Sequence, residues 1–238
     1  AASELRAAGF TATELRLGTF PAKEVKAVGY ILSELKNGGF SVADLKTVDY
    51  SAAELKGTGF TMIELKNGGF TPLELKEAGS TVQEMRECGY KTRMLRSVGF
   101  TPEELKDVGC PVKEMRLAGF SVSELYDVGY SAHDLKLGGF SIREFKDMGL
   151  SVQIMKGVGF QASELEDVGF TALELKDGGF SCSELVALSF LPEELKLIGY
   201  TAKELHGGGL TAKELKEGGF TLDDLKAIGI PAYKLRTL

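Results

Sequence analysis

Tryptophan is absent from this 238-residue chain, histidine occurs only twice and cysteine only three times. So few metal-binding and nucleophilic side chains leave little material for a zinc site or a catalytic dyad. Charged residues recur within every ten positions, so no stretch approaches the roughly 20 apolar residues of a membrane span. The sequence therefore predicts neither an enzyme nor a protein inserted in a membrane.

The balance of charge is mildly negative, with 28 Lys and Arg against 34 Asp and Glu and a net charge of −6. A chain with this balance has no global attraction for nucleic acid or for anionic lipid. Cys88, Cys110 and Cys182 stand where other repeats carry small or apolar residues. We therefore expect buried, unbridged thiols and a reducing, intracellular and most simply cytoplasmic location.

Residues 1–238 form a single continuous array of 24 ten-residue repeats without an insertion or deletion. The consensus is S/T-A/V-x-E-L-K-x-x-G-F, as in TAKELKEGGF at 211–220. Position 1 is Ser or Thr in 16 repeats, position 4 is Glu in 18 and Asp in three, and position 6 is Lys or Arg in 20. Position 5 is apolar in all 24 repeats. Twenty-three repeats reach positions 9 and 10, and among these position 9 is Gly in 20 and position 10 is aromatic in 18. Because Ala1 begins a repeat with no leader before it, we expect a segment excised from a longer protein.

Each repeat position has a local role that favours one short helix. Ser or Thr followed three residues later by Glu is a capping box, which makes position 1 the N-cap. Position 2 is then the first helical residue, where proline is tolerated, and it holds Pro72, Pro102 and Pro192. Gly at position 9 before a large apolar residue is typical of a Schellman ending, which requires a left-handed glycine. Each repeat is therefore predicted to be a helix of about two turns and one tight corner.

Such short helices are unstable alone and must be held by packing between repeats. Positions 2, 5 and 8 share one helix face, and with position 10 they supply an apolar surface that only neighbouring repeats can cover. In this the chain resembles α-solenoid repeat proteins as a class. We expect an all-α, rod-shaped solenoid of 24 short helices, with its handedness open.

The irregular repeats bear on how the solenoid winds. In three of the repeats that lack the position-10 aromatic, the next repeat has Met in place of Leu at position 5. The pairs are Ser80 with Met85, Cys110 with Met115, and Leu150 with Met155. Because long Met side chains fill vacated space and the pairs lie three and then four repeats apart, we predict three to four helices per superhelical turn.

An apolar residue at every fifth position also resembles the pentapeptide-repeat β-helices, as in SVADLKTVDYSAAEL at 41–55. That fold needs a small inward-pointing residue two positions before each central one. Position 3 instead includes Lys23, Arg93, Glu103 and Arg143. Those side chains cannot be interior, so the helical interpretation is preferred.

No cofactor or metal site is predicted from the sequence. The acidic residues at position 4 are already explained by the capping box. His133 and His206 stand at different repeat positions with no metal-ligand spacing around them. The glycines end helices and therefore do not form a phosphate-binding loop, which precedes a helix.

Three functions remain, of which a non-enzymatic scaffold for protein–protein interaction is preferred, by analogy with other solenoids. The uniform repeats also fit a passive spacer or filament segment, with end-to-end self-association. The Lys and Arg column at position 6 could follow a nucleic-acid backbone. The acidic column at position 4 is as populated, however, and charged exposed faces serve solubility, so the sequence disfavours nucleic acid.

Four apolar residues replace the usual charge and are the candidate partner contacts. Met94 and Ile154 stand at position 4, and Tyr126 and Val186 at position 6. An exposed apolar side chain in a charged column can anchor an interface once it is buried. Positions 4 and 6 point to opposite sides of one helix, so at most two stripes are expected. Isolated apolar surface residues also occur without any function.

Overall fold

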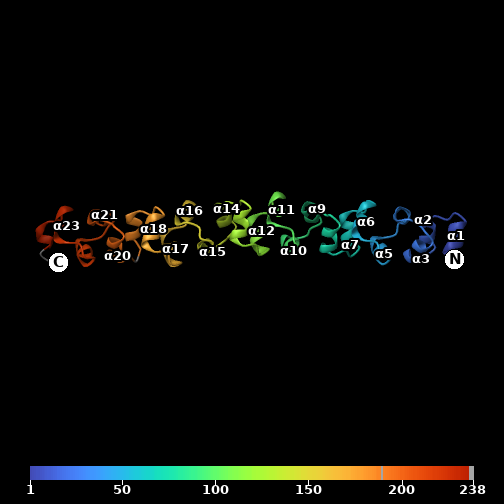
Figure 1. Cartoon of the computed structure of the whole chain (residues 1–238), viewed down its shortest axis with the longest axis horizontal. Helices are drawn as coiled ribbons and strands as arrows, with labels where there is room; N and C mark the ends of the chain where they lie inside the picture. Colours follow the sequence, from blue (N-terminus) through green and yellow to red (C-terminus); the bar gives the residue numbers. More distant parts are fainter. Residues whose placement is uncertain (189, 236–238) are drawn as a thin grey trace. The chain divides into compact units, whose positions relative to one another are not determined.

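The computed structural model describes residues 1–188 and 190–235, which form 24 short helices and no strand (Figure 1). The chain divides into two compact units, residues 1–120 and residues 121–238. The first unit contains α1 (Ala2–Ala7), α2 (Ala12–Leu17), α3 (Ala22–Ala27), α4 (Leu32–Asn37), α5 (Val42–Lys46), α6 (Ala52–Gly57), α7 (Met62–Asn67), α8 (Pro72–Glu77), α9 (Val82–Glu87), α10 (Thr92–Ser97), α11 (Pro102–Asp107) and α12 (Val112–Leu117). The second contains α13 (Val122–Asp127), α14 (Ala132–Leu137), α15 (Ile142–Asp147), α16 (Val152–Gly157), α17 (Ala162–Asp167), α18 (Ala172–Asp177), α19 (Cys182–Val186), α20 (Pro192–Leu197), α21 (Ala202–Gly207), α22 (Ala212–Glu217), α23 (Leu222–Ala227) and α24 (Ala232–Leu235). One helix per ten residues confirms the prediction.

The helices begin as the capping box predicts. Each of the 16 Ser or Thr residues at position 1 accepts a hydrogen bond from the amide three residues on. In α6, the Glu54 carboxylate in turn accepts from the Ser51 amide at 2.8 Å. Both ends of the box are therefore satisfied locally, which helps a helix of six residues to form.

The helices also end as predicted. After α6, the Phe60 amide donates to the Leu55 carbonyl at 3.1 Å, and the Gly59 amide donates to the Lys56 carbonyl at 2.9 Å. This bond pair is the Schellman motif, and Gly59 has the left-handed φ of +87° that the motif requires. Thr19 and Asp49 adopt the same conformation without being glycine, each with a φ of +63°.

The core is a column of position-5 side chains flanked by positions 2, 8 and 10. Leu55, Met85 and Phe145 at position 5 are completely buried. Phe145 also packs edge-to-face on Phe160 of the next repeat, with ring centroids 5.4 Å apart and an angle of 73° between the ring planes. Position 3 is exposed throughout the described repeats, as the helical interpretation requires.

The cysteines follow the prediction only in part. None of the three forms a disulfide, and Cys110 at position 10 is buried. Cys88 at position 8 and Cys182 at position 2 are half-buried, so the prediction that all three are buried is wrong for two. Burial at positions 2 and 8 varies from repeat to repeat, whereas position 5 is buried in nearly all of them. Burial raises the pKa of the Cys110 and Cys182 thiols, which disfavours the reactive thiolate.

A pair of glycine substitutions tests the corner geometry. Gly179 has a φ of +88° and Gly157 lies within α16, and a Cβ added to either would meet no atom within 4 Å. We expect Gly179→Ala to destabilise the protein by about 1 kcal/mol through left-handed strain. Gly157→Ala should stabilise it by roughly 0.5 kcal/mol, because alanine favours a helix. Urea denaturation measures both, and equal effects would contradict the left-handed corner.

The capping boxes should make the fold sensitive to acid. Hydrogen bonds from the N-cap amide, and then from its hydroxyl, lower the pKa of Glu14, Glu54 and Glu214. A carboxylate whose pKa is lower in the folded than in the unfolded state stabilises the fold at pH values above its unfolded pKa, which is about 4.3 for Glu. That stabilisation is lost as the pH falls through the folded-state pKa. We therefore expect a melting temperature, followed by circular dichroism, that falls steeply below about pH 4. A melting temperature unchanged between pH 5 and pH 2 would show that the caps contribute little.

Candidate functional site

One kind of surface groove recurs along the chain, built each time from four consecutive repeats. Positions 6, 9 and 10 of one repeat and positions 1 to 3 of the next form one side of the groove. The aromatic at position 10 of the second following repeat and positions 4, 7 and 8 of the third form the other. We name each groove after the helix that supplies position 6. The α4, α5, α8 and α15 grooves have volumes of about 430, 460, 470 and 460 Å³.

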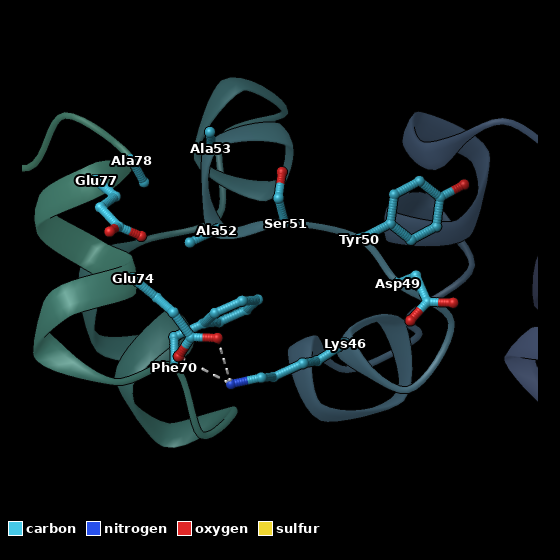
Figure 2. Close-up of a pocket in the computed structure, with 10 residues that line it drawn as sticks. All are labelled: Lys46, Asp49, Tyr50, Ser51, Ala52, Ala53, Phe70, Glu74, Glu77 and Ala78. Atoms are coloured by element: carbon cyan, nitrogen blue, oxygen red, sulfur yellow. Dashed lines mark hydrogen bonds and ion pairs between the residues drawn. The ribbon is translucent and has the colours of Figure 1, made fainter.

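The α5 groove shows how the groove is built (Figure 2). The Lys46 ammonium lies 4.3 Å from the centre of the Phe70 ring and donates to the Gly69 carbonyl at 2.7 Å. It also forms an ion pair with Glu74 at 3.1 Å. Asp49 and Glu77 line the same groove and add negative charge to it. The groove therefore combines an aromatic surface, an engaged cation and carboxylates.

The position-6 cation joins its repeat to the second repeat after it at several places within each unit. Lys146 donates to the carbonyls of Val168 and Gly169 at 2.7 and 2.8 Å and lies 4.5 Å from the Phe170 ring centre. Arg6 makes the same contacts with Val28 and Tyr30 in the first unit. These carbonyls end a helix, where a cation is electrostatically favoured. The position-6 column is therefore part of the packing between repeats, in addition to providing charge at the surface.

The same cation reaches position 4 of the third following repeat in several grooves. Besides Lys46 and Glu74, Lys56 pairs with Glu84 at 2.8 Å. The hydrogen bond from Lys56 is the largest of the effects that lower the pKa of Glu84. Positions 4 and 6 diverge on one helix, but the winding of the chain brings them together between repeats. One stripe on the surface can therefore include both positions, which stays within the expected limit of two stripes.

The sequence contains a signal for this contact that local pattern analysis missed. The chain has 21 pairs in which a repeat is matched with the second repeat after it. In 17 of them, position 6 of the first repeat is Lys or Arg. Position 10 of the second is aromatic in 15 of those 17 pairs. Where position 6 is Tyr126, Glu166, Val186 or His206, position 10 is aromatic in only one of the four pairs. The two positions thus vary together within one chain, as residues in contact do.

The structure places the four predicted contact residues in two different environments. Met94 and Ile154 at position 4 are exposed, by 46% and 36%. Tyr126 and Val186 at position 6 are half-buried, where other repeats have a partly covered cation. An added Cβ on Gly208 would lie 3.3 Å from Val186, so Val186 packs on the corner of the second following repeat.

Two of the four residues are related by the register that relates Lys46 and Glu74. Ile154 stands at position 4 of the third repeat after Tyr126, as Glu74 does after Lys46. Leu150 replaces the aromatic between them. An apolar set therefore replaces the cation, ring and carboxylate of the other grooves. Partner contact by these four residues stays a prediction.

Within residues 1–188 and 190–235, no three His, Cys, Asp or Glu side chains are grouped so that they could hold a metal ion. No helix in these ranges has the length and apolar character needed to cross a bilayer. The recurring groove is therefore the candidate site, and its repetition suits an extended, polymeric ligand.

Comparison with known families gives one match. A family model described as a decapeptide repeat region matches residues 1–62, 39–112, 109–181 and 159–232. These overlapping segments together cover almost the whole array. A search of curated proteins found no match.

Proposed function

Since the chain belongs to the decapeptide repeat family, and its repeats form a series of matching grooves, we propose that it is a non-enzymatic scaffold that binds extended segments of other proteins. The observation that carries the proposal is the recurrence of one groove with nearly constant volume in both units. A regular series of equivalent sites gains affinity for a long ligand by adding weak contacts.

The lining of the grooves supports a protein ligand over a nucleic acid. The position-6 cations already donate to carbonyls and lie over rings, so they are not free to track phosphates. Exposed carboxylates such as Glu77 and Asp177 line the rims and would repel a phosphate backbone. The remaining lining is apolar and hydroxylic, which suits a peptide with mixed side chains.

We further propose that the repeats wind as a rod-shaped solenoid with about three to four helices per superhelical turn. Contacts from one repeat to its second and third followers support this number. Small-angle X-ray scattering tests the rod shape. The reduced cysteines support a reducing compartment inside the cell.

Selection from a random peptide library against the immobilised chain tests the scaffold function. We expect selected peptides to lose binding to a double variant, Ala43→Arg with Ala53→Arg, which places long side chains in the α4 and α5 grooves. Ala7→Arg is the matched control, because Ala7 is exposed and lines none of the four grooves. Binding to the control should be unchanged.

The alternative functions predict different results in the same experiment. A passive spacer or filament segment, favoured by the uniform repeats, would enrich no peptide above background. A nucleic-acid binder would retain duplex or single-stranded DNA at low ionic strength and release it as salt rises. Either result would replace the scaffold proposal.

A further inference from the structure

The α17 groove is named by register, because α17 belongs to the repeat that supplies position 6 in the equivalent place of the other grooves. The position-6 residue of α17 is Glu166, whereas the α4, α5, α8 and α15 grooves have lysine there. The groove has a volume of about 280 Å³ and is lined by Thr171, Ala172, Leu173, Phe190, Glu194, Leu197 and Ile198. Positions 1 to 3 of one repeat, position 10 of the next and positions 4, 7 and 8 of the one after also line the other grooves, whereas no residue of the α17 repeat is among these seven.

The rest of the cation site is present in the α17 groove. Phe190 supplies the ring at position 10. Glu194 supplies the position-4 carboxylate and is the equivalent of Glu74, which pairs with Lys46 in the α5 groove. Among the described residues, no Lys or Arg lies over the Phe190 ring, which is half-buried. Leu173 and Leu197 are exposed by 48% and 86% at the rim.

We propose that the α17 groove binds a lysine or arginine side chain of a partner protein, in the position that the chain's own position-6 lysine occupies in other grooves. The ammonium or guanidinium group lies over Phe190 and beside Glu194, and its aliphatic stem packs on Leu173, Leu197 and Ile198. This inference rests on the proposed scaffold function and names the residue type that one groove recognises.

The charge around the groove is complementary to a cationic side chain. Residues 121–238 carry 18 acidic and 12 basic side chains, whereas residues 1–120 carry 16 of each, so the net charge of −6 arises in the second unit. Glu166 stands at the repeat position where the other grooves have a lysine, so this position contributes no positive charge. A cation over an aromatic ring gains about 0.5–2 kcal/mol, depending on how far it is desolvated. The exposed leucines at the rim provide that desolvation.

The experiment uses the full chain with methyl-labelled leucine and isoleucine and the synthetic peptide acetyl-Leu-Lys-Leu-amide. We expect saturable NMR shifts of the Leu173, Leu197 and Ile198 methyl groups. A peptide with norleucine in place of lysine has the same length but no charge, and should bind about tenfold more weakly.

Two charge variants separate this site from general electrostatic attraction. Glu166→Lys restores the repeat consensus, so the chain's own lysine should fill the groove and weaken peptide binding about tenfold while the protein stays folded. Asp167→Lys changes the charge equally at an exposed neighbour, and should leave binding within about twofold.

Three results would overturn the proposal: equal binding of the lysine and norleucine peptides, equal weakening by the two variants, or no saturable shift in the natural chain. If one of these occurs while library peptides still require the α4 and α5 grooves, this inference fails and the scaffold function stands. If no library peptide binds either, both fail.

Discussion

Replacing Phe145 with alanine is expected to lower the free energy of unfolding by about 3–5 kcal/mol, because a buried ring is removed from a closely packed core. Phe145 is completely buried in the position-5 column, and its ring meets the edge of Phe160 at a centroid distance of 5.4 Å. Neighbouring side chains are held by short helices and corners, so they cannot move far enough to close the cavity. Urea denaturation measures the change.

Two further variants of α15 make this prediction specific. Phe145→Leu restores the residue that most repeats carry at position 5 and should cost about 1 kcal/mol. Arg143→Ala alters an exposed position-3 residue of the same helix and should change stability by less than about 0.5 kcal/mol. If Phe145→Ala costs no more than Arg143→Ala, the position-5 column is not the core.

The effect of Phe145→Ala should also be local. In an array, each repeat contacts only near neighbours, so stability is roughly a sum of repeat and interface contributions. Hydrogen exchange should therefore accelerate most in the repeats around α15, and far less in α2 to α4. Uniform acceleration throughout the chain would indicate that the whole array unfolds in one step.

The local structure of each repeat could be predicted from the sequence because its determinants lie within ten residues. Ser51 and Glu54 form the N-terminal cap with one another, and Gly59 sets the corner by its own left-handed conformation. Burial at position 5 also follows from the apolar pattern alone. These features depend on bonds between residues three to five apart, which a pattern within the repeat encodes directly.

Packing between repeats could not be predicted in the same way. The distance from Lys46 to Phe70 depends on the angle that each corner adds, and no single repeat fixes that angle. A small change in the angle would place another repeat opposite Lys46. Only the joint variation of positions 6 and 10 carries the information, because it compares two repeats at a fixed separation.

The candidate site was missed for the same reason. Tyr126 and Val186 stand out in the sequence because they lack charge. They occupy the position of a packed cation, and position 10 of the second repeat after each is Leu150 or Leu210, which is not aromatic. Their apolar character thus has a structural explanation within the array. Glu166 is the more unusual residue, since the ring two repeats later is retained as Phe190.

Replacing Lys146 with methionine is expected to lower the free energy of unfolding by about 1–2 kcal/mol. Methionine keeps the aliphatic stem but removes the charged donor to the carbonyls of Val168 and Gly169, and the cation over Phe170. The side chain is half-buried, so solvent screening reduces the loss below that of a fully buried charge.

A double-mutant cycle with Phe170→Leu isolates the contribution of the ring. The coupling between Lys146 and Phe170 should be about 0.5–1 kcal/mol, and Lys203→Met, at an exposed position 3, is the control for removing a surface charge. Raising the salt concentration should leave most of the Lys146→Met effect in place, because hydrogen bonds to carbonyls are screened less than exposed ion pairs. If Lys146→Met and Lys203→Met are equally neutral, the position-6 cations do not hold the repeats together. They would then be available for a ligand, and the nucleic-acid alternative would regain its basis.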